Sequence, residues 1–157
     1  MRRRVELFVV LFLLLFVCCS LAPQKQTGGD ASDFSLESVG GATVSLSDYK
    51  GSDVILFFWT TWCPHCRKRL VDLNEKYEDM VASGIKLISI DVGESKSIAK
   101  RFRDKYSLAY PVLLDYNKRV AIEYGVIGVP TTILISKDGK ILKSSTILPY
   151  NYKDLFK

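Results

Sequence analysis

The chain of 157 residues has few of the histidine and cysteine side chains from which zinc centres are built. It contains a single histidine, His65, and four cysteines, of which Cys18 and Cys19 lie in an apolar N-terminal segment. A structural zinc site normally needs four cysteine or histidine ligands. Outside that segment only Cys63, Cys66 and His65 remain, and His65 lies between the two cysteines, where it cannot readily join them around one ion. The sequence therefore predicts no metal ion and no other cofactor.

The sequence also lacks a strong charge bias and internal repeats. The formal net charge is +5, but from residue 28 onward the chain has 18 basic and 16 acidic residues. There is no basic stripe interleaved with aromatic residues, so we expect no nucleic-acid partner. With 48% apolar and 25% charged residues, the chain is long enough for one folded domain with its own core.

The N-terminal segment combines three arginines, at positions 2–4, with an apolar run from Leu7 to Val17. This pattern is typical of a secretory signal peptide or signal-anchor. The run is apolar on every face, which argues against an N-terminal core helix. Because positively charged flanks stay on the cytoplasmic side, we expect the domain to lie outside the cytoplasm. That means the periplasm or the outer face of the cell membrane, where disulfides can form.

Three fates of this segment stay open. Residues 7–22 are slightly fewer than the ~20 that span a bilayer, yet we rank a retained membrane anchor first. A lipid on Cys18 or Cys19 ranks second, and simple cleavage ranks third, because Pro23 would directly follow the cut. The expected organisation is a signal peptide or anchor over 1–22, a linker over 23–32 and a folded domain over 33–157.

Hydrophobic periodicity in the domain predicts alternating strands and helices. The dense apolar run at 53–59 indicates a buried strand. A helix should begin at Cys63 and end before Gly84, and the Asp138-Gly139 pair predicts a hairpin. The other expected elements are a hairpin within 34–46, strands over 85–91, 111–115, 131–136 and 141–146, and helices over 97–106, 118–124 and 151–157. This order predicts an α/β fold, a mixed sheet with helices on both faces.

Residues 59–66 read WTTWCPHC and place two cysteines where the buried strand meets the helix. A helix N-terminus offers unpaired N–H groups and positive potential, which favour a thiolate, the attacking species in disulfide exchange. A purely structural disulfide would close only a short loop, which restrains the unfolded chain least. We therefore interpret Cys63 and Cys66 as a redox-active dithiol. Pro64 suits the first helical turn, and we expect His65 to stabilise the thiolate of Cys63.

This segment resembles the active site of thioredoxin-fold proteins, and within them the TlpA/ResA group of membrane-tethered extracytoplasmic thiol-disulfide oxidoreductases. The resemblance runs from about Asp33 to Thr146. It includes FSLESVGGATVSLSDYKG (34–51), DVGESK (91–96) and GVPTTILISKDGKI (128–141). It implies a thioredoxin-like fold, with a central mixed sheet flanked by helices and an N-terminal hairpin extension.

The resemblance also implies roles for individual residues. Cys63 would be the exposed nucleophile and Cys66 the buried resolving cysteine. Pro130 matches the family's cis-proline, which leaves backbone groups beside Val129 free to pair with a substrate strand; cis bonds are nearly confined to proline. Glu94 matches an acidic residue that relays protons to the resolving cysteine. Trp62, Pro64 and His65 complete the expected site.

Two departures bear on the direction of electron flow. Phe57 stands where thioredoxin has a buried aspartate, which leaves Glu94 as the candidate proton relay. The Pro64-His65 pair is the one found in oxidising DsbA-type proteins, whose potential lies at about −120 mV against about −270 mV for thioredoxin. The large helical insertion of DsbA is absent, however. We favour a protein-disulfide reductant, with a DsbA-like oxidant as the alternative.

Two other classes are less well supported. Thr60 and Cys63 supply the Thr-x-x-Cys part of the peroxiredoxin pattern, but Leu56 stands where the proline of a thiol peroxidase belongs. A metal-carrying binding module would need a further histidine or methionine ligand near the pair. The family resemblance implies protein substrates with cysteine pairs, including apocytochrome c before haem attachment in cytochrome c maturation. It also implies a membrane thiol-disulfide protein as electron donor, and we expect a monomer.

Overall fold

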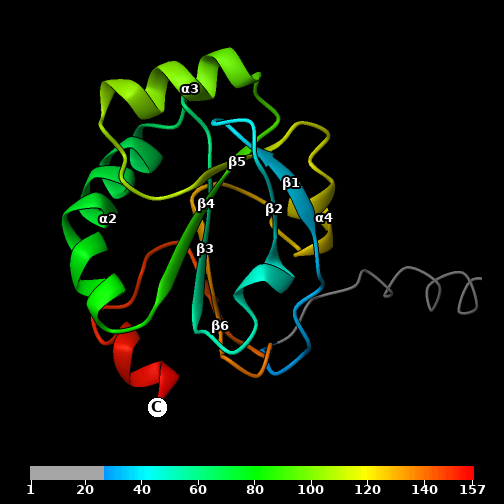
Figure 1. The fold of residues 1–157 in the computed structure, drawn as a ribbon, viewed down its shortest axis with the longest axis vertical. Helices are drawn as coiled ribbons and strands as arrows, with labels where there is room; N and C mark the ends of the chain where they lie inside the picture. The colour runs from blue at the N-terminus through cyan, green and yellow to red at the C-terminus, as the bar shows by residue number, and fades with distance from the viewer. Residues whose placement is uncertain (1–26) are drawn as a thin grey trace, which may run out of the picture.

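The computed structural model describes residues 27–157, which form a central β-sheet with helices on both faces (Figure 1). The expected anchor over 1–22 and the first part of the expected linker lie outside the described residues. Within residues 27–157, no helix is both long and apolar enough to span a membrane. The elements are β1 (Ser35–Ser38), β2 (Thr43–Ser45), η1 (Leu46–Tyr49), β3 (Val54–Trp59), α2 (Pro64–Ala82), β4 (Lys86–Val92), α3 (Lys96–Lys105), β5 (Val112–Asp115), α4 (Arg119–Glu123), β6 (Thr131–Ile135), β7 (Ile141–Ser145) and η2 (Tyr152–Phe156).

The sheet has seven strands in the order β2-β1-β5-β4-β3-β6-β7. Strands β3, β4 and β5 run parallel, whereas β6 and β7 on one side and β1 and β2 on the other are antiparallel additions. All six residues of β3 are buried, because a parallel strand in the middle of the sheet is covered on both faces. The expected mixed sheet and α/β fold are thus confirmed.

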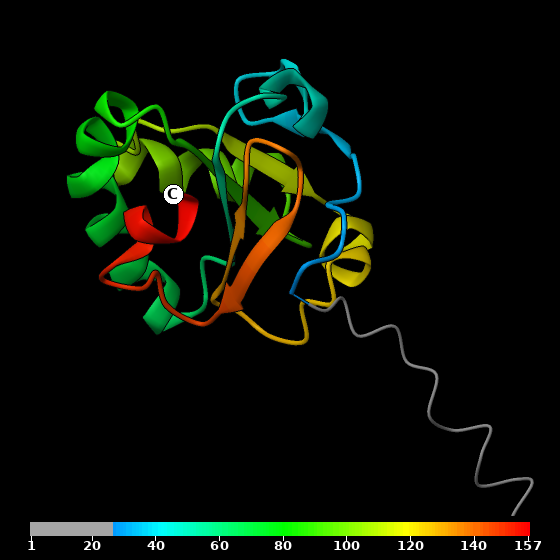
Figure 2. The same cartoon turned by 90° about the horizontal axis from the view of Figure 1, so that it is seen from below.

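Side chains of β3 alternate between two hydrophobic cores. Ile55, Phe57 and Trp59 face the core beneath α2, α3 and η2, whereas Leu56 and Phe58 face the core beneath α4. This alternation follows from the two-residue period of a strand. Viewed from below, η2 lies beside α2 on one face of the sheet and α4 lies on the other (Figure 2). The end of β3 is therefore buried from both sides, which gives the segment after it a rigid support.

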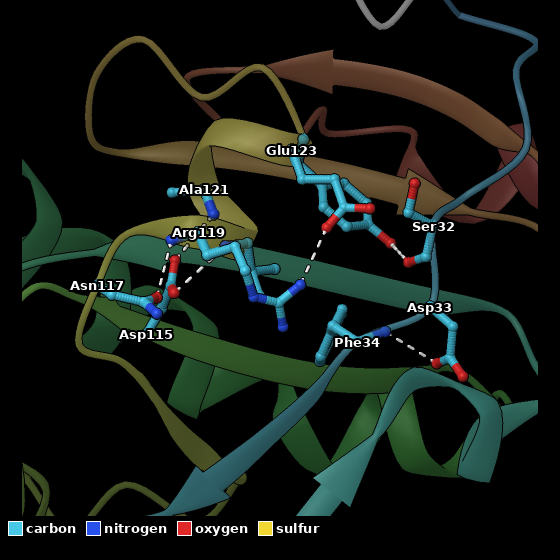
Figure 3. A network of polar contacts seen from close by, with 10 residues as sticks. Ser32, Asp33, Phe34, Asp115, Asn117, Arg119, Ala121 and Glu123 are labelled. Carbon is cyan, nitrogen blue, oxygen red and sulfur yellow. Dashed lines mark hydrogen bonds and ion pairs between the residues drawn. The ribbon is translucent and has the colours of Figure 1, made fainter.

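A buried carboxylate sets the position of α4. Asp115 ends β5 with no exposed surface, and its two oxygens accept the N–H groups of Val120, at 3.3 Å, and Ala121, at 2.8 Å (Figure 3). Charge-assisted bonds of this kind satisfy N–H groups that the first turn of a helix leaves unpaired. The hydroxyl of Tyr124, at the end of α4, donates to the carbonyl of Ser32 and so ties the N-terminal segment to this helix.

Three features differ from the periodicity-based expectations. Residues 46–49 form a 3-10 turn, begun by a capping box between Ser45 and Asp48. The C-terminal segment 152–156 is also a 3-10 turn rather than the expected helix. The expected linker residues 28–31 are hydrogen-bonded to the β6–β7 hairpin, through Gly28 N–H to Ile141 O at 2.7 Å and Ala31 N–H to Gly139 O at 2.8 Å.

Candidate active site

Cys63 is the N-cap residue of α2, directly after the loop that leaves β3. Its sulfur accepts the backbone N–H of Cys66 at 3.2 Å, and Pro64 occupies the first helical turn, where no N–H bond is lost. The Cys63 N–H donates to the carbonyl of Thr60 at 3.4 Å. The sulfur of Cys63 therefore lies at the positive end of a helix of 19 residues.

The two thiols are free and inequivalent. Cys66 has no exposed surface, and burial raises its pKa well above the usual value for a thiol, with a further contribution from Cys63. Cys63 was expected to be exposed, but it is only 5% exposed. The N-cap position folds its sulfur over the first turn of α2, where it also lies 3.7 Å from the carbonyl oxygen of Val129. A substrate can thus reach only a small part of Cys63, and none of Cys66.

The bond between Val129 and Pro130 is cis, as predicted. It lies in the segment that joins α4 to β6, and the Val129 carbonyl accepts the Cys63 thiol across 66 positions of sequence. The hydroxyl of Thr131 donates to the carbonyl of Gly128 at 2.7 Å and closes this turn. The fold therefore brings the expected substrate-binding residues directly against the expected nucleophile.

Glu94 holds the loop that precedes Cys63. One of its carboxylate oxygens accepts the backbone N–H of Thr61 and the other accepts the Thr61 hydroxyl, both at 2.6 Å. Its own N–H donates to Asp91 at 3.3 Å. Glu94 is thus an anchored residue of the site rather than a freely solvated loop carboxylate. The observed partner is Thr61, and the expected proton transfer to Cys66 stays a prediction.

Trp62 and His65 lie at the surface around the dithiol. The Trp62 side chain is 69% exposed, and Ile127, in the loop before the cis-proline, is fully exposed. His65 is exposed, and its side chain forms no hydrogen bond or ion pair with any residue from 27 to 157. Its expected effect on the Cys63 thiolate would therefore act through space.

Asp91 is a member of this site that the sequence analysis treated only as the end of a strand. It is fully buried in β4, directly opposite Trp59 of β3. Burial raises the pKa of Asp91 to about 8, and the neighbouring Glu94 carboxyl adds to this effect. The available signal was one acidic residue next to the end of the mostly apolar strand sequence KLISIDV. In the described part of the chain, no cluster of three or more histidine, cysteine or acidic side chains could hold a metal ion.

The fold and this site define a class of protein. A free dithiol at the N-terminus of a helix, facing the carbonyl before a cis-proline on a mixed sheet, is the arrangement of a thioredoxin-fold thiol-disulfide oxidoreductase. The model of the AhpC/TSA family matches residues 27–144, and the chain belongs to this family.

Named relatives agree with this class. The thiol-disulfide oxidoreductase ResA of Bacillus subtilis (strain 168) is 34% identical over an alignment of 157 positions, which includes 93% of this chain and 88% of the relative. ResA of Geobacillus thermodenitrificans is 37% identical, over 76% of this chain and 68% of the relative. The chain is a thiol-disulfide oxidoreductase of the ResA-like kind.

Solved structures show the same fold. The thioredoxin domain of a thiol-disulfide oxidoreductase from Bacteroides vulgatus superposes with a TM-score of 0.73 at 25% identity, over 82% of this chain and 94% of that one. StoA from Bacillus subtilis superposes with a TM-score of 0.68 at 26% identity, over 80% of this chain and 97% of that one. The expected thioredoxin-like fold is thus confirmed.

Proposed function

We propose that this protein is a tethered extracytoplasmic enzyme that reduces disulfides in protein substrates through Cys63 and Cys66. The observation that carries the proposal is the inequivalence of the two thiols. Cys63 is the partly reachable N-cap of α2, whereas Cys66 is fully buried behind it. Cys63 also contacts the carbonyl of Val129, beside which a substrate strand would pair. This arrangement suits one attacking and one resolving sulfur.

In the proposed reaction, the Cys63 thiolate attacks one sulfur of a substrate disulfide. The other substrate sulfur leaves as a thiolate and takes up a proton. Cys66 then loses its proton and attacks the Cys63 sulfur, which releases the second substrate thiol and leaves a Cys63–Cys66 disulfide. Two electrons pass to the substrate in each cycle. A membrane thiol-disulfide protein would return the enzyme to the dithiol form.

Apocytochrome c is the proposed substrate, as the resemblance to the TlpA/ResA group implies. Its paired cysteines must be reduced before haem attachment, and the arginine-rich N-terminal segment would keep the enzyme at the membrane where that step occurs. A DsbA-like oxidant is the second candidate, because Pro64 and His65 form the dipeptide of that class. The two candidates differ in the direction of electron flow, not in the residues that carry it.

Insulin reduction by dithiothreitol tests the exchange activity, and a glutathione titration tests its direction. We expect the protein to accelerate insulin reduction. An unchanged rate of insulin reduction would contradict the proposed function. A midpoint nearer to about −270 mV supports a reductant, whereas one nearer to about −120 mV supports the oxidant. A Cys63→Ser variant is the control for exchange that does not involve the dithiol.

The full-length protein is expected in the membrane fraction, because residues 2–4 are arginines and an apolar run begins at Leu7. Fractionation of cells that express the full chain measures this. Labelling with a fatty-acid analogue that is lost in a double Cys18→Ser, Cys19→Ser variant indicates lipidation, and membrane binding without labelling indicates a retained anchor. A soluble product that starts near Pro23 would contradict the tether.

His65→Ala is expected to make the Cys63–Cys66 couple more reducing, because a positive charge near Cys63 stabilises the thiolate found only in the reduced form. The side chain is exposed, so the shift should not exceed roughly 30 mV, which corresponds to about 1.4 kcal/mol. A glutathione redox titration measures the shift. Lys68→Ala, which removes an exposed charge further along α2, is the control. An unchanged or more oxidising couple would show that other groups set the potential.

A further inference from the structure

Unpaired polar atoms collect at the end of β4, one strand away from the dithiol loop. Asp91 has no exposed surface; its Oδ1 accepts the N–H of Glu94, but its Oδ2 has no hydrogen-bond partner within residues 27–157. Trp59, directly opposite on β3, has a buried Nε1 that is likewise unpaired in the described structure. A buried carboxylate with an unpaired oxygen is unfavourable, whereas a neutral carboxylic acid carries its own donor.

Asp91 is connected to both cysteines through a short series of contacts. Its neighbour Glu94 holds the N–H and the hydroxyl of Thr61 at 2.6 Å each. The carbonyl of the preceding residue, Thr60, accepts the Cys63 N–H at 3.4 Å. The Thr60 backbone also acts on the Cys66 thiol, in the direction of a lower pKa. A change at Asp91 can therefore reach the dithiol loop through Glu94 without any direct contact with sulfur.

We propose that Asp91 is a positioning residue for the dithiol: as a neutral acid it shares its proton with the carboxylate of Glu94, and thereby keeps Glu94 bound to Thr61. Loss of the proton would place two carboxylates side by side, and their repulsion would weaken the hold of Glu94 on the loop. The loop would then position the sulfurs less well for exchange. This inference rests on the proposed function and adds a regulating group to the same site.

The charged groups around Asp91 do not offer it a counter-ion. Lys96, at the start of α3, is engaged in an ion pair with Glu37 of β1 at 2.5 Å. Tyr116, which follows β5, interacts electrostatically with Asp91, Glu37 and Lys96. Within residues 27–157 no lysine, arginine or histidine lies within ion-pair distance of Asp91. The remaining titratable neighbour is Glu94, a group of the same charge.

The proton should therefore be lost just above neutral pH. Burial, together with the Glu94 carboxyl, raises the pKa of Asp91 to about 8. Below that pH the neutral acid supports the loop, and above it the loop is released. The rate of exchange also changes with pH through the Cys63 thiol itself. The effect of Asp91 is therefore measured as the rate of an Asp91 variant divided by the rate of the wild-type protein, since both contain Cys63.

Asp91→Asn is the decisive variant, because asparagine keeps the shape and the donor of the neutral acid but cannot ionise. The rate of insulin reduction by this variant, divided by the rate of the wild-type protein, should be constant below about pH 8. Above that pH it should rise severalfold, because only the wild-type loop is released. Asp91→Ala removes the donor and should be slower than Asp91→Asn throughout.

Asp115→Asn is the matched control. Asp115 is also a fully buried carboxylate at the end of a strand, but its oxygens accept N–H groups of α4 rather than facing Glu94. Its rate ratio to the wild-type protein should not change across about pH 8. A flat ratio for Asp91→Asn, with an active wild-type protein, would overturn the inference while leaving the proposed function intact. An inactive wild-type protein would instead contradict the proposed function.

A direct titration decides the matter if Asp91→Asn does not fold. The carbon-13 shift of the Asp91 carboxyl in the reduced wild-type protein should change near pH 8, and Asp91→Ala identifies the signal. A carboxyl that titrates near the ordinary value of 3.8 would be ionised at neutral pH and would overturn the inference.

Discussion

Cys66→Ser should accumulate covalent complexes with substrate proteins, and Cys63→Ser should form none. Cys63 retains exposed surface and lies at the helix N-terminus, so it alone can attack a substrate disulfide. Cys66 is fully buried and holds its proton more strongly than an ordinary thiol, so it can act only on the adjacent Cys63. Without Cys66 the mixed disulfide has no internal route to release.

Non-reducing gel electrophoresis after incubation with a disulfide-bonded protein measures the trapped species. Addition of dithiothreitol should release it, and insulin reduction should be lost in Cys63→Ser. The double variant, with serine at both positions, is the control for complexes that do not involve the dithiol. Equal trapping by the two single variants would contradict the assignment of nucleophile and resolving cysteine.

Trp59→Ala should lower the free energy of unfolding by about 3–5 kcal/mol, the range typical of removing a large aromatic side chain from a core. Trp59 is the last residue of β3, has no exposed surface, and packs on Phe102 of α3 with ring centroids 5.1 Å apart. It also fills the core opposite Asp91, so its loss opens a cavity beneath the dithiol loop. Urea unfolding followed by circular dichroism measures the change.

Trp62→Ala is the matched control, since the chain has only two tryptophans and this one is 69% exposed. Its stability should change by less than about 0.5 kcal/mol, as for most surface substitutions. Its reduction of insulin should be slower, whereas reduction of a small disulfide such as oxidised glutathione should change little. Similar losses of stability in the two variants would contradict the different burial of the two side chains.

The order of strands and helices was predictable because each element carries its own apolar period. The run at 54–59 is apolar at every position, and it forms the central strand β3. The 19-residue helix α2 buries Leu70, Leu73 and Met80 on one face, at the helical spacing visible in the sequence. The position of Cys63 between these two elements was therefore also predictable.

Pairings between distant segments were not predictable in the same way. The N-terminal hairpin was expected as an extension, but nothing in its residues indicates that β1 pairs with β5. The low exposure of Cys63 was likewise missed, because it depends on Val129, 66 positions away. Such contacts depend on how complete elements pack, and no local period records them.

The sequence by itself indicated the class of protein, because local periodicity places two cysteines at a strand–helix junction and the motifs there and around the later Val-Pro pair resemble those of thioredoxin-fold oxidoreductases. Only the tertiary structure decided how these parts act together. It buries Cys66 while leaving part of Cys63 reachable, and it sets Glu94 on Thr61 and Asp91 beside Glu94. The physical reason is that burial and electrostatic environment are properties of packed neighbours. In an unfolded chain Asp91 would be an ordinary ionised group. In the folded protein it lies between β3 and β5 beside the Glu94 carboxyl, and this environment raises its pKa and favours the neutral acid.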